Sequence, residues 1–81
     1  MLTSEQIRAA RMLLRWEQKD LADKSGVSLP TIKRIESRPG EVQSYASTVA
    51  ALVAALEEAG IELIGPSATS AGQGAGVRLR S

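Results

Sequence analysis

The chain contains neither cysteine nor histidine, and these two absences exclude much of the chemistry open to a small protein. Without cysteine it can form no disulfide and no thiolate metal site. Without histidine it lacks the common zinc ligand and the usual base for a nucleophile. Its acidic residues are scattered along predicted helix faces or adjacent on one helix, which is typical of solvated charges. We therefore predict a protein that is not an enzyme and that holds no metal and no cofactor.

Long apolar runs are missing as well. No stretch approaches the roughly 18 residues of a membrane span, and the N-terminus lacks the basic start and apolar core of a signal peptide. We therefore predict a cytoplasmic protein without a membrane partner. With 81 residues, the chain should form one small domain that buries only about 60% of its unfolded surface. Small domains often gain stability by association, so we expect an oligomer.

The net charge is only +1, but it is unevenly distributed along the chain. Residues 1–40 carry eight Lys and Arg against five acids, net +3, and residues 41–81 carry two against four, net −2. A positive half is the electrostatic feature that phosphate binding requires.

Four helices are predicted from capping signals and apolar spacing. The first follows a capping box of Thr3 and Gln6 and ends near Arg15. Its buried stripe comprises apolar residues at helical spacing, with one more alongside: Ile7, Ala10 and Leu14, then Leu13. Trp16, the only tryptophan, is expected to pack over the core where the first two helices meet.

The second helix is predicted over about residues 17–24, with Leu21 and Ala22 facing inward. It should end at Gly26, because glycine takes the left-handed conformation without a Cβ clash. Val27 then fills the corner before the next helix.

Ser28 is a suitable N-cap for a third helix over about residues 29–37. Pro30 lies in its first turn, where the missing N–H costs nothing. Ile32 and Ile35 point inward, so the opposite face is left exposed.

The fourth helix is predicted from about residue 47 or 48 to Ala59, and Gly60 ends it. Glu57 and Glu58 oppose the helix dipole at its C-terminus, so we expect a local partner to offset them.

Two short strands are predicted after the helices, over residues 61–64 and 77–80. The small, polar, glycine-rich segment 65–76 between them should be mobile, and its glycines precede a strand rather than a helix, so they form no nucleotide loop. The strands could pair within one chain or between two chains. Because a two-stranded ribbon is marginal alone, we favour dimerisation through the fourth helix and these strands.

Residues 18–36 read Gln-x-x-Leu-Ala-x-x-x-Gly-Val-Ser-x-x-Thr-Ile-x-x-Ile-Glu. This pattern resembles the helix-turn-helix of the lambda-repressor-like family, also called the xenobiotic-response-element type. The resemblance covers about residues 3–59. With the elements predicted above, it gives a mainly α fold. We expect a compact four-helix helix-turn-helix domain over residues 1–60, followed by a C-terminal pair of β-strands and a Gly-rich loop over 61–81 as a dimerisation element.

The resemblance implies that the third helix enters the major groove of double-stranded DNA. Arg34 is the first candidate for a base contact, because arginine pairs bidentately with guanine. Leu29 and Pro30 depart from the polar residues frequent in the family and could contact a thymine methyl. The full set of base-contact candidates is Arg34, Leu29, Pro30 and Lys33.

Phosphate contacts and one internal ion pair are implied in the same way. The phosphate-contact candidates are Gln18, Ser28, Thr31, Lys19 and Arg38. Arg11 and Glu36 match a pair that forms a salt bridge between the first and third helices in this family, so they are expected to be structural.

Three functions fit these observations. The first is a sequence-specific DNA-binding transcriptional regulator, a repressor or autoregulator that acts as a homodimer on a palindromic operator. The second is the antitoxin of a toxin–antitoxin pair, with segment 65–76 and the terminal strand facing the toxin. The third is a protein-interaction module that has lost DNA binding. Leu29 and Pro30 keep this third possibility open, whereas the retained basic residues argue against it. A toxin or a co-regulator is thus a possible protein partner.

Overall fold

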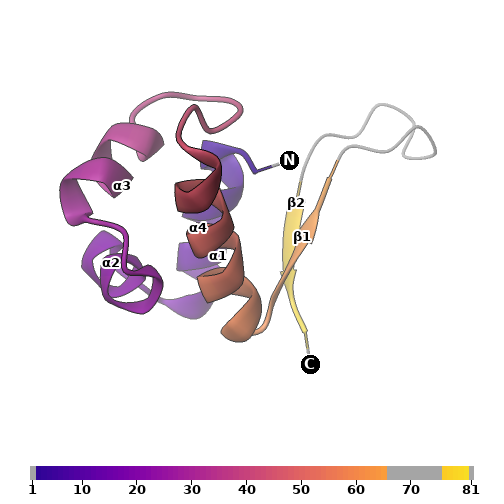
Figure 1. Ribbon diagram of the computed structural model, residues 1–81. Coiled ribbons are helices and arrows are strands. Elements are labelled where there is room, and N and C mark those ends of the chain that lie inside the picture. Colours follow the sequence, from indigo (N-terminus) through magenta and orange to yellow (C-terminus); the bar gives the residue numbers. More distant parts are fainter. Residues whose placement is uncertain (1, 66–75, 81) are drawn as a thin grey trace.

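The computed structural model describes residues 2–65 and 76–80. The elements follow one another in the order α1 (Ser4–Leu14), α2 (Gln18–Ser25), α3 (Leu29–Glu36), α4 (Ala46–Glu58), β1 (Ile61–Ile64) and β2 (Gly76–Leu79) (Figure 1). The predicted mainly α fold with a C-terminal strand pair is confirmed. Apart from Gly65 and Gly76, the segment predicted to be mobile lies outside the described residues. No helix within the described ranges is long and apolar enough to cross a membrane.

The helix ends lie within two residues of the predicted positions, because local capping groups set them. Thr3 Oγ1 accepts a hydrogen bond from Gln6 N at 3.1 Å, and Gln6 Oε1 accepts one from Thr3 N at 2.9 Å. This reciprocal pair is the capping box expected from the sequence. Gly26 closes α2 in the left-handed region with φ 77°, and Ser28 Oγ caps α3 by accepting from Thr31 N at 3.3 Å.

The backbone conformation that closes α1 is a feature that the sequence did not predict. Arg15 adopts the left-handed conformation with φ 59° and ψ 39°, and among the described residues it alone does so without being glycine. Its backbone N–H bonds Met12 O at 3.2 Å, which satisfies a carbonyl at the helix end. The helix therefore ends at Leu14. Leu13 lies within α1 but off the face of Ile7, Ala10 and Leu14, and 42% of its surface is exposed. The prediction that Leu13 lies in the buried stripe is wrong.

The core lies between the four helices and the first strand. Its buried apolar residues are Leu2, Ile7, Ala10, Leu21, Ile32, Ile35, Leu52, Ala55, Leu56 and Ile61. Trp16 packs against this cluster, as predicted, together with Leu14, Ala22 and Val27.

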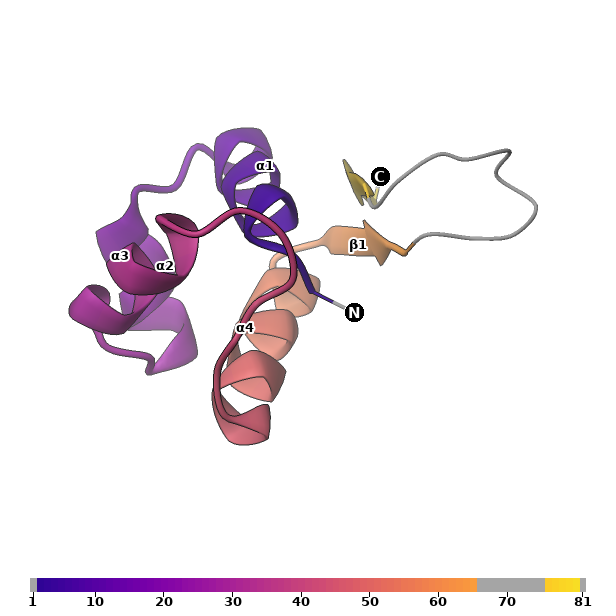
Figure 2. The same ribbon diagram turned by 90° about the horizontal axis from the view of Figure 1, so that it is seen from above.

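The two strands pair within the chain as an antiparallel hairpin, in a register that sets Ile61 opposite Leu79 and Ile64 opposite Gly76. Of the two arrangements left open by the sequence, the structure shows this one. Figures 1 and 2 place the hairpin on one side of the α1–α4 layer and α2 and α3 on the other. Helix α3 and the hairpin therefore occupy opposite sides of the molecule.

Gln6 fastens the hairpin to α1. Its Nε2 donates to Ile64 O and to Gly76 O, each at 3.1 Å, and the residue is only 2% exposed. Because its Oε1 is occupied in the capping box, one buried amide both starts α1 and holds the two strands. At the other end, Arg80 donates to Glu57 O and Ile61 O, each at 3.4 Å. Arg80 thus brings a positive charge to the carbonyl end of α4 from a distant part of the chain. The expected local partner for the Glu57 and Glu58 carboxylates is not seen, since neither forms an ion pair among the described residues.

Candidate nucleic-acid interface

The third helix presents a basic face to solvent because its apolar residues are spaced to face inward. Ile32 and Ile35 are buried, whereas Lys33 and Arg34 between them are exposed. Figure 1 shows α3 at the edge of the helical body, beside α2. The two side chains form no ion pair within the described residues. They are therefore cations available to an external acceptor.

Glu36 joins three helices at the buried end of α3. Arg11 on α1 donates from Nε to Glu36 Oε2 at 2.8 Å and from Nη2 to Oε1 at 2.7 Å. Gln18 at the start of α2 donates from Nε2 to the same Oε1 at 3.1 Å. The Arg11 and Glu36 side chains are 16% and 4% exposed. The expected ion pair is therefore present, bidentate and largely removed from water, and it fixes the position of α3.

The Gln18 side chain already donates a hydrogen bond inside the protein, so less of it is available for the predicted contact with phosphate. One N–H of its amide donates to Glu36, so the second amide N–H and the backbone N–H groups of the first turn of α2 remain for an anion. Glu17 and Asp20 flank this turn, and Asp20 Oδ2 accepts from Glu17 N at 2.8 Å. These carboxylates stabilise the helix start, yet they also repel a phosphate there. A phosphate contact at Gln18 stays a prediction.

The other phosphate candidates are spread around α2 and α3. Lys19 and Arg38 are exposed and form no ion pair within residues 2–65 and 76–80. Ser28 and Thr31 are different, because Ser28 Oγ donates to Thr31 Oγ1 at 2.9 Å. Their hydroxyls are thus partly satisfied by each other.

Sequence reasoning missed two contacts that anchor the end of α3. Arg8 Nη1 donates to Glu36 O at 3.5 Å, and Glu5 accepts from Gly40 N at 3.1 and 3.3 Å through its two oxygens. Hydrogen bonds from its own backbone N–H and from Gly40 N lower the pKa of Glu5. Both contacts join residues about thirty positions apart, so no local pattern could reveal them.

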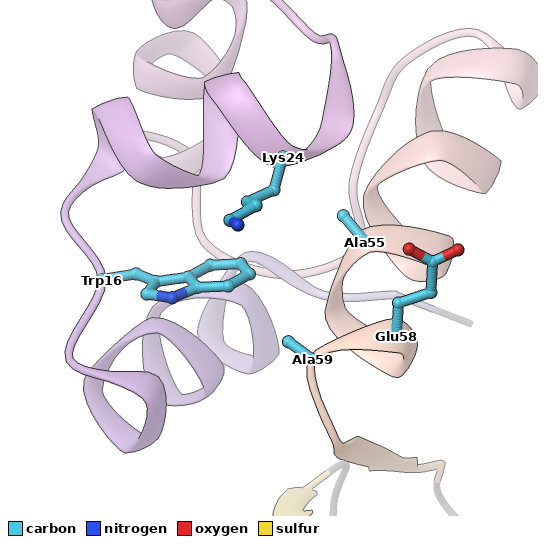
Figure 3. Close-up of a pocket in the computed structure, with 5 residues that line it drawn as sticks. All are labelled: Trp16, Lys24, Ala55, Glu58 and Ala59. Atoms are coloured by element: carbon cyan, nitrogen blue, oxygen red, sulfur yellow. The ribbon is translucent and has the colours of Figure 1, made fainter.

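A small hollow lies beside Trp16, between α2 and the C-terminal end of α4 (Figure 3). Its volume is about 140 Å³, which is below the roughly 300–1,000 Å³ typical of ligand pockets. Its lining residues are Trp16, Lys24, Ala55, Glu58 and Ala59. We assign Trp16 to packing on this basis. No cluster of acidic side chains suited to a metal occurs among the described residues.

Comparison with known proteins agrees with this geometry. Residues 7–44, slightly less than half of the chain, match the family model described as helix-turn-helix. No curated protein is similar enough to the chain to count as a match. The matched segment contains most of α1 and all of α2 and α3, with the Arg11–Glu36 pair. The chain therefore contains a helix-turn-helix domain of the lambda repressor-like family, whose members are DNA-binding transcription regulators.

Proposed function

We propose that this protein is a sequence-specific transcription regulator that binds a palindromic operator as a homodimer. Bound there, it represses transcription, including that of its own gene. The observation that carries the proposal is the exposed pair Lys33 and Arg34 on a helix that Glu36 ties to two others. A fixed helix can present its side chains to base edges in one register, which sequence readout requires. The proposed place of action is the cytoplasm.

Association through the hairpin side of the molecule is the second part of the proposal. On the hairpin side, the exposed large apolar side chains are Ile64 and Leu79 on the strands and Leu13 on α1, seven residues and so about two turns from Gln6. A second copy that covers them removes apolar surface from water. It also leaves both copies of α3 accessible, because α3 lies across the α1–α4 layer from the hairpin. Ile64 and Leu79 lie on the strands favoured from the sequence, whereas the helix that contributes is α1 rather than α4.

The same exposed apolar surface supports a second candidate function, in which the occupant is a different protein. An antitoxin would bind its toxin there and keep α3 for its operator. Sedimentation of the purified chain separates the two. The homodimer predicts a species of twice the chain mass at the concentrations that saturate DNA. A monomer under those conditions contradicts the homodimer and favours the second function.

DNA binding is tested directly by fluorescence anisotropy with the duplex immediately upstream of the gene, at physiological salt and with a shuffled duplex as competitor. We expect binding that resists the competitor and weakens by about 5- to 150-fold in Arg34→Ala, the range of one bidentate arginine–guanine contact. Lys24→Ala is the matched control, because it removes the same charge from an exposed residue that lies beside Trp16 rather than on α3 or the hairpin. Equal losses in the two variants would mean that Arg34 acts only through net charge. Equal binding of both duplexes would show phosphate contact alone.

A further inference from the structure

Part of the hydrogen-bonding capacity at the start of α3 is already used inside the protein, although the hydroxyl proton of Thr31 is donated to no described residue. Ser28 Oγ accepts from Thr31 N at 3.3 Å and donates its proton to Thr31 Oγ1 at 2.9 Å. The hydroxyl proton of Ser28 is therefore used, and the oxygen of Thr31 already accepts one hydrogen bond. A polar residue at the start of a recognition helix is the usual reader of adenine or guanine. Here the capping hydrogen bonds already use part of the donor and acceptor capacity of Ser28 and Thr31.

The two remaining side chains of this turn are apolar. Pro30 is exposed and carries no N–H, and Leu29 is half-buried. Within the described part of the chain, Leu29 does not belong to the apolar residues that pack against the core cluster. It thus has no role in the interior that would explain an apolar residue at this place. Both residues lie on the helix that presents Lys33 and Arg34.

A pyrimidine methyl group is the base feature that such a surface can read. In the major groove, thymine differs from cytosine by an exposed 5-methyl group, which apolar side chains contact. Pro30 and Arg34 are four residues apart and so share a helix face, about 6 Å apart along the axis. With successive bases about 3.4 Å apart, the two side chains lie roughly two base pairs from each other when the helix follows the groove.

We propose that the first turn of α3 recognises thymine methyl groups through Pro30 and Leu29, and that hydrogen-bonded base readout comes from its basic residues, Arg34 first. The inference rests on the proposed function, since it concerns the same DNA-binding face. It predicts the base composition of the operator half-site, in which one or two thymines lie about two base pairs from a guanine.

The test begins with duplexes that the full-length protein selects from a randomised pool. Each thymine of the selected half-site is then replaced singly by uracil, which removes only the methyl group. Loss of one buried methyl should weaken binding by about fourfold, equivalent to about 0.8 kcal/mol. Uracil at a thymine outside the half-site is the control and should leave affinity unchanged.

Variants locate the contact on the protein. In Pro30→Ala and Leu29→Ala, the penalty for uracil should shrink towards onefold, while Pro39→Ala, an exposed proline beyond α3, should keep it in full. Thermal unfolding of each variant confirms that it is folded. Because the uracil series also uses the unaltered protein, a variant that fails to fold still leaves the inference testable.

The outcomes distinguish a failure of this inference from a failure of the proposed function. Enriched half-sites without thymine, or with thymines that tolerate uracil, would overturn the inference and leave the regulator intact. A uracil penalty unchanged in both Pro30→Ala and Leu29→Ala would also overturn it, because the methyl would then be sensed elsewhere. A pool from which no sequence is enriched would contradict the proposed function itself.

Discussion

Replacing Arg11 with alanine should unfold the domain before it alters DNA recognition. The change removes two short hydrogen bonds to Glu36 and a third, from Nη1 to Trp16 O at 3.1 Å. It leaves a carboxylate whose side chain is 4% exposed with Gln18 as its remaining polar side-chain partner. Removing one partner of a buried ion pair costs about 3–5 kcal/mol. A domain of this size is stable by only about 4–12 kcal/mol, so the loss is a large fraction of the total.

Urea and thermal unfolding measure this loss directly, with fluorescence of the single Trp16 and far-ultraviolet circular dichroism as two probes. A change of 1 kcal/mol shifts the melting temperature of a domain this small by about 4–8 °C, so we expect a decrease of at least about 12 °C. The matched control is the double variant Arg11→Met with Glu36→Leu, which removes both charges and should recover most of the stability. An unchanged melting temperature in Arg11→Ala would refute the structural role. A double variant as unstable as the single one would refute the buried-charge explanation.

Three further predictions concern the ends of α1 and the ionised carboxylates. Arg15→Gly should raise the free energy of unfolding by about 1 kcal/mol, since a left-handed residue with a Cβ costs about 1–2 kcal/mol, and thermal unfolding will measure it. Gln6→Leu should lower stability by about 1–3 kcal/mol per carbonyl left without a donor at the hairpin, and amide exchange should locate the loss in β1 and β2. The pKa values of Glu5, through backbone hydrogen bonds, and of Glu62, through its bond to Arg78, are both lowered from 4.5. Their stabilisation is therefore present above pH 4.5 and lost as pH falls through the lowered values, which a pH series of melting temperatures will show.

Each of these predictions has a result that contradicts it. Arg15→Gly contradicts the strain argument if it melts no higher than the unaltered protein. Gln6→Leu contradicts the fastening role if the strand amides stay as protected as before. Glu62→Gln should flatten part of the acid limb of the stability curve, and an identical curve would show that the exposed pair with Arg78 contributes nothing.

Local signals in the sequence predicted the helices because helix ends are set by residues three or four positions apart. The capping box of Thr3 and Gln6 and the turn at Gly26 are of this kind. The exposed basic face of α3 followed from the spacing of its two buried isoleucines. The Arg11–Glu36 pair came from the family resemblance, because spacing alone does not bring residues 25 positions apart together.

What the sequence could not predict depends on contacts between distant segments or on a strained backbone. Gln6 was assigned a local capping role, yet its second amide atom holds strands 58 and 70 residues away. Leu13 was placed beside the apolar stripe, yet it lies off the helix face of Ile7, Ala10 and Leu14 and is 42% exposed. Separately, the helix is closed by Arg15 in a left-handed conformation that arginine rarely adopts. The engagement of Gln18 by Glu36 also required three helices to be placed before it could be seen.

The bond between Gln6 and the hairpin has a consequence for the order of events during synthesis. Gln6 leaves the ribosome 70 residues before Gly76, and at about 5–20 residues per second the interval is about 4–14 s. The helices of the core can pair within this interval, because such local contacts form in microseconds to milliseconds. Through that interval the amide nitrogen of Gln6 faces a side of α1 that β2 has yet to cover. The cover of this side of α1 is thus the last part of the fold that the growing chain supplies.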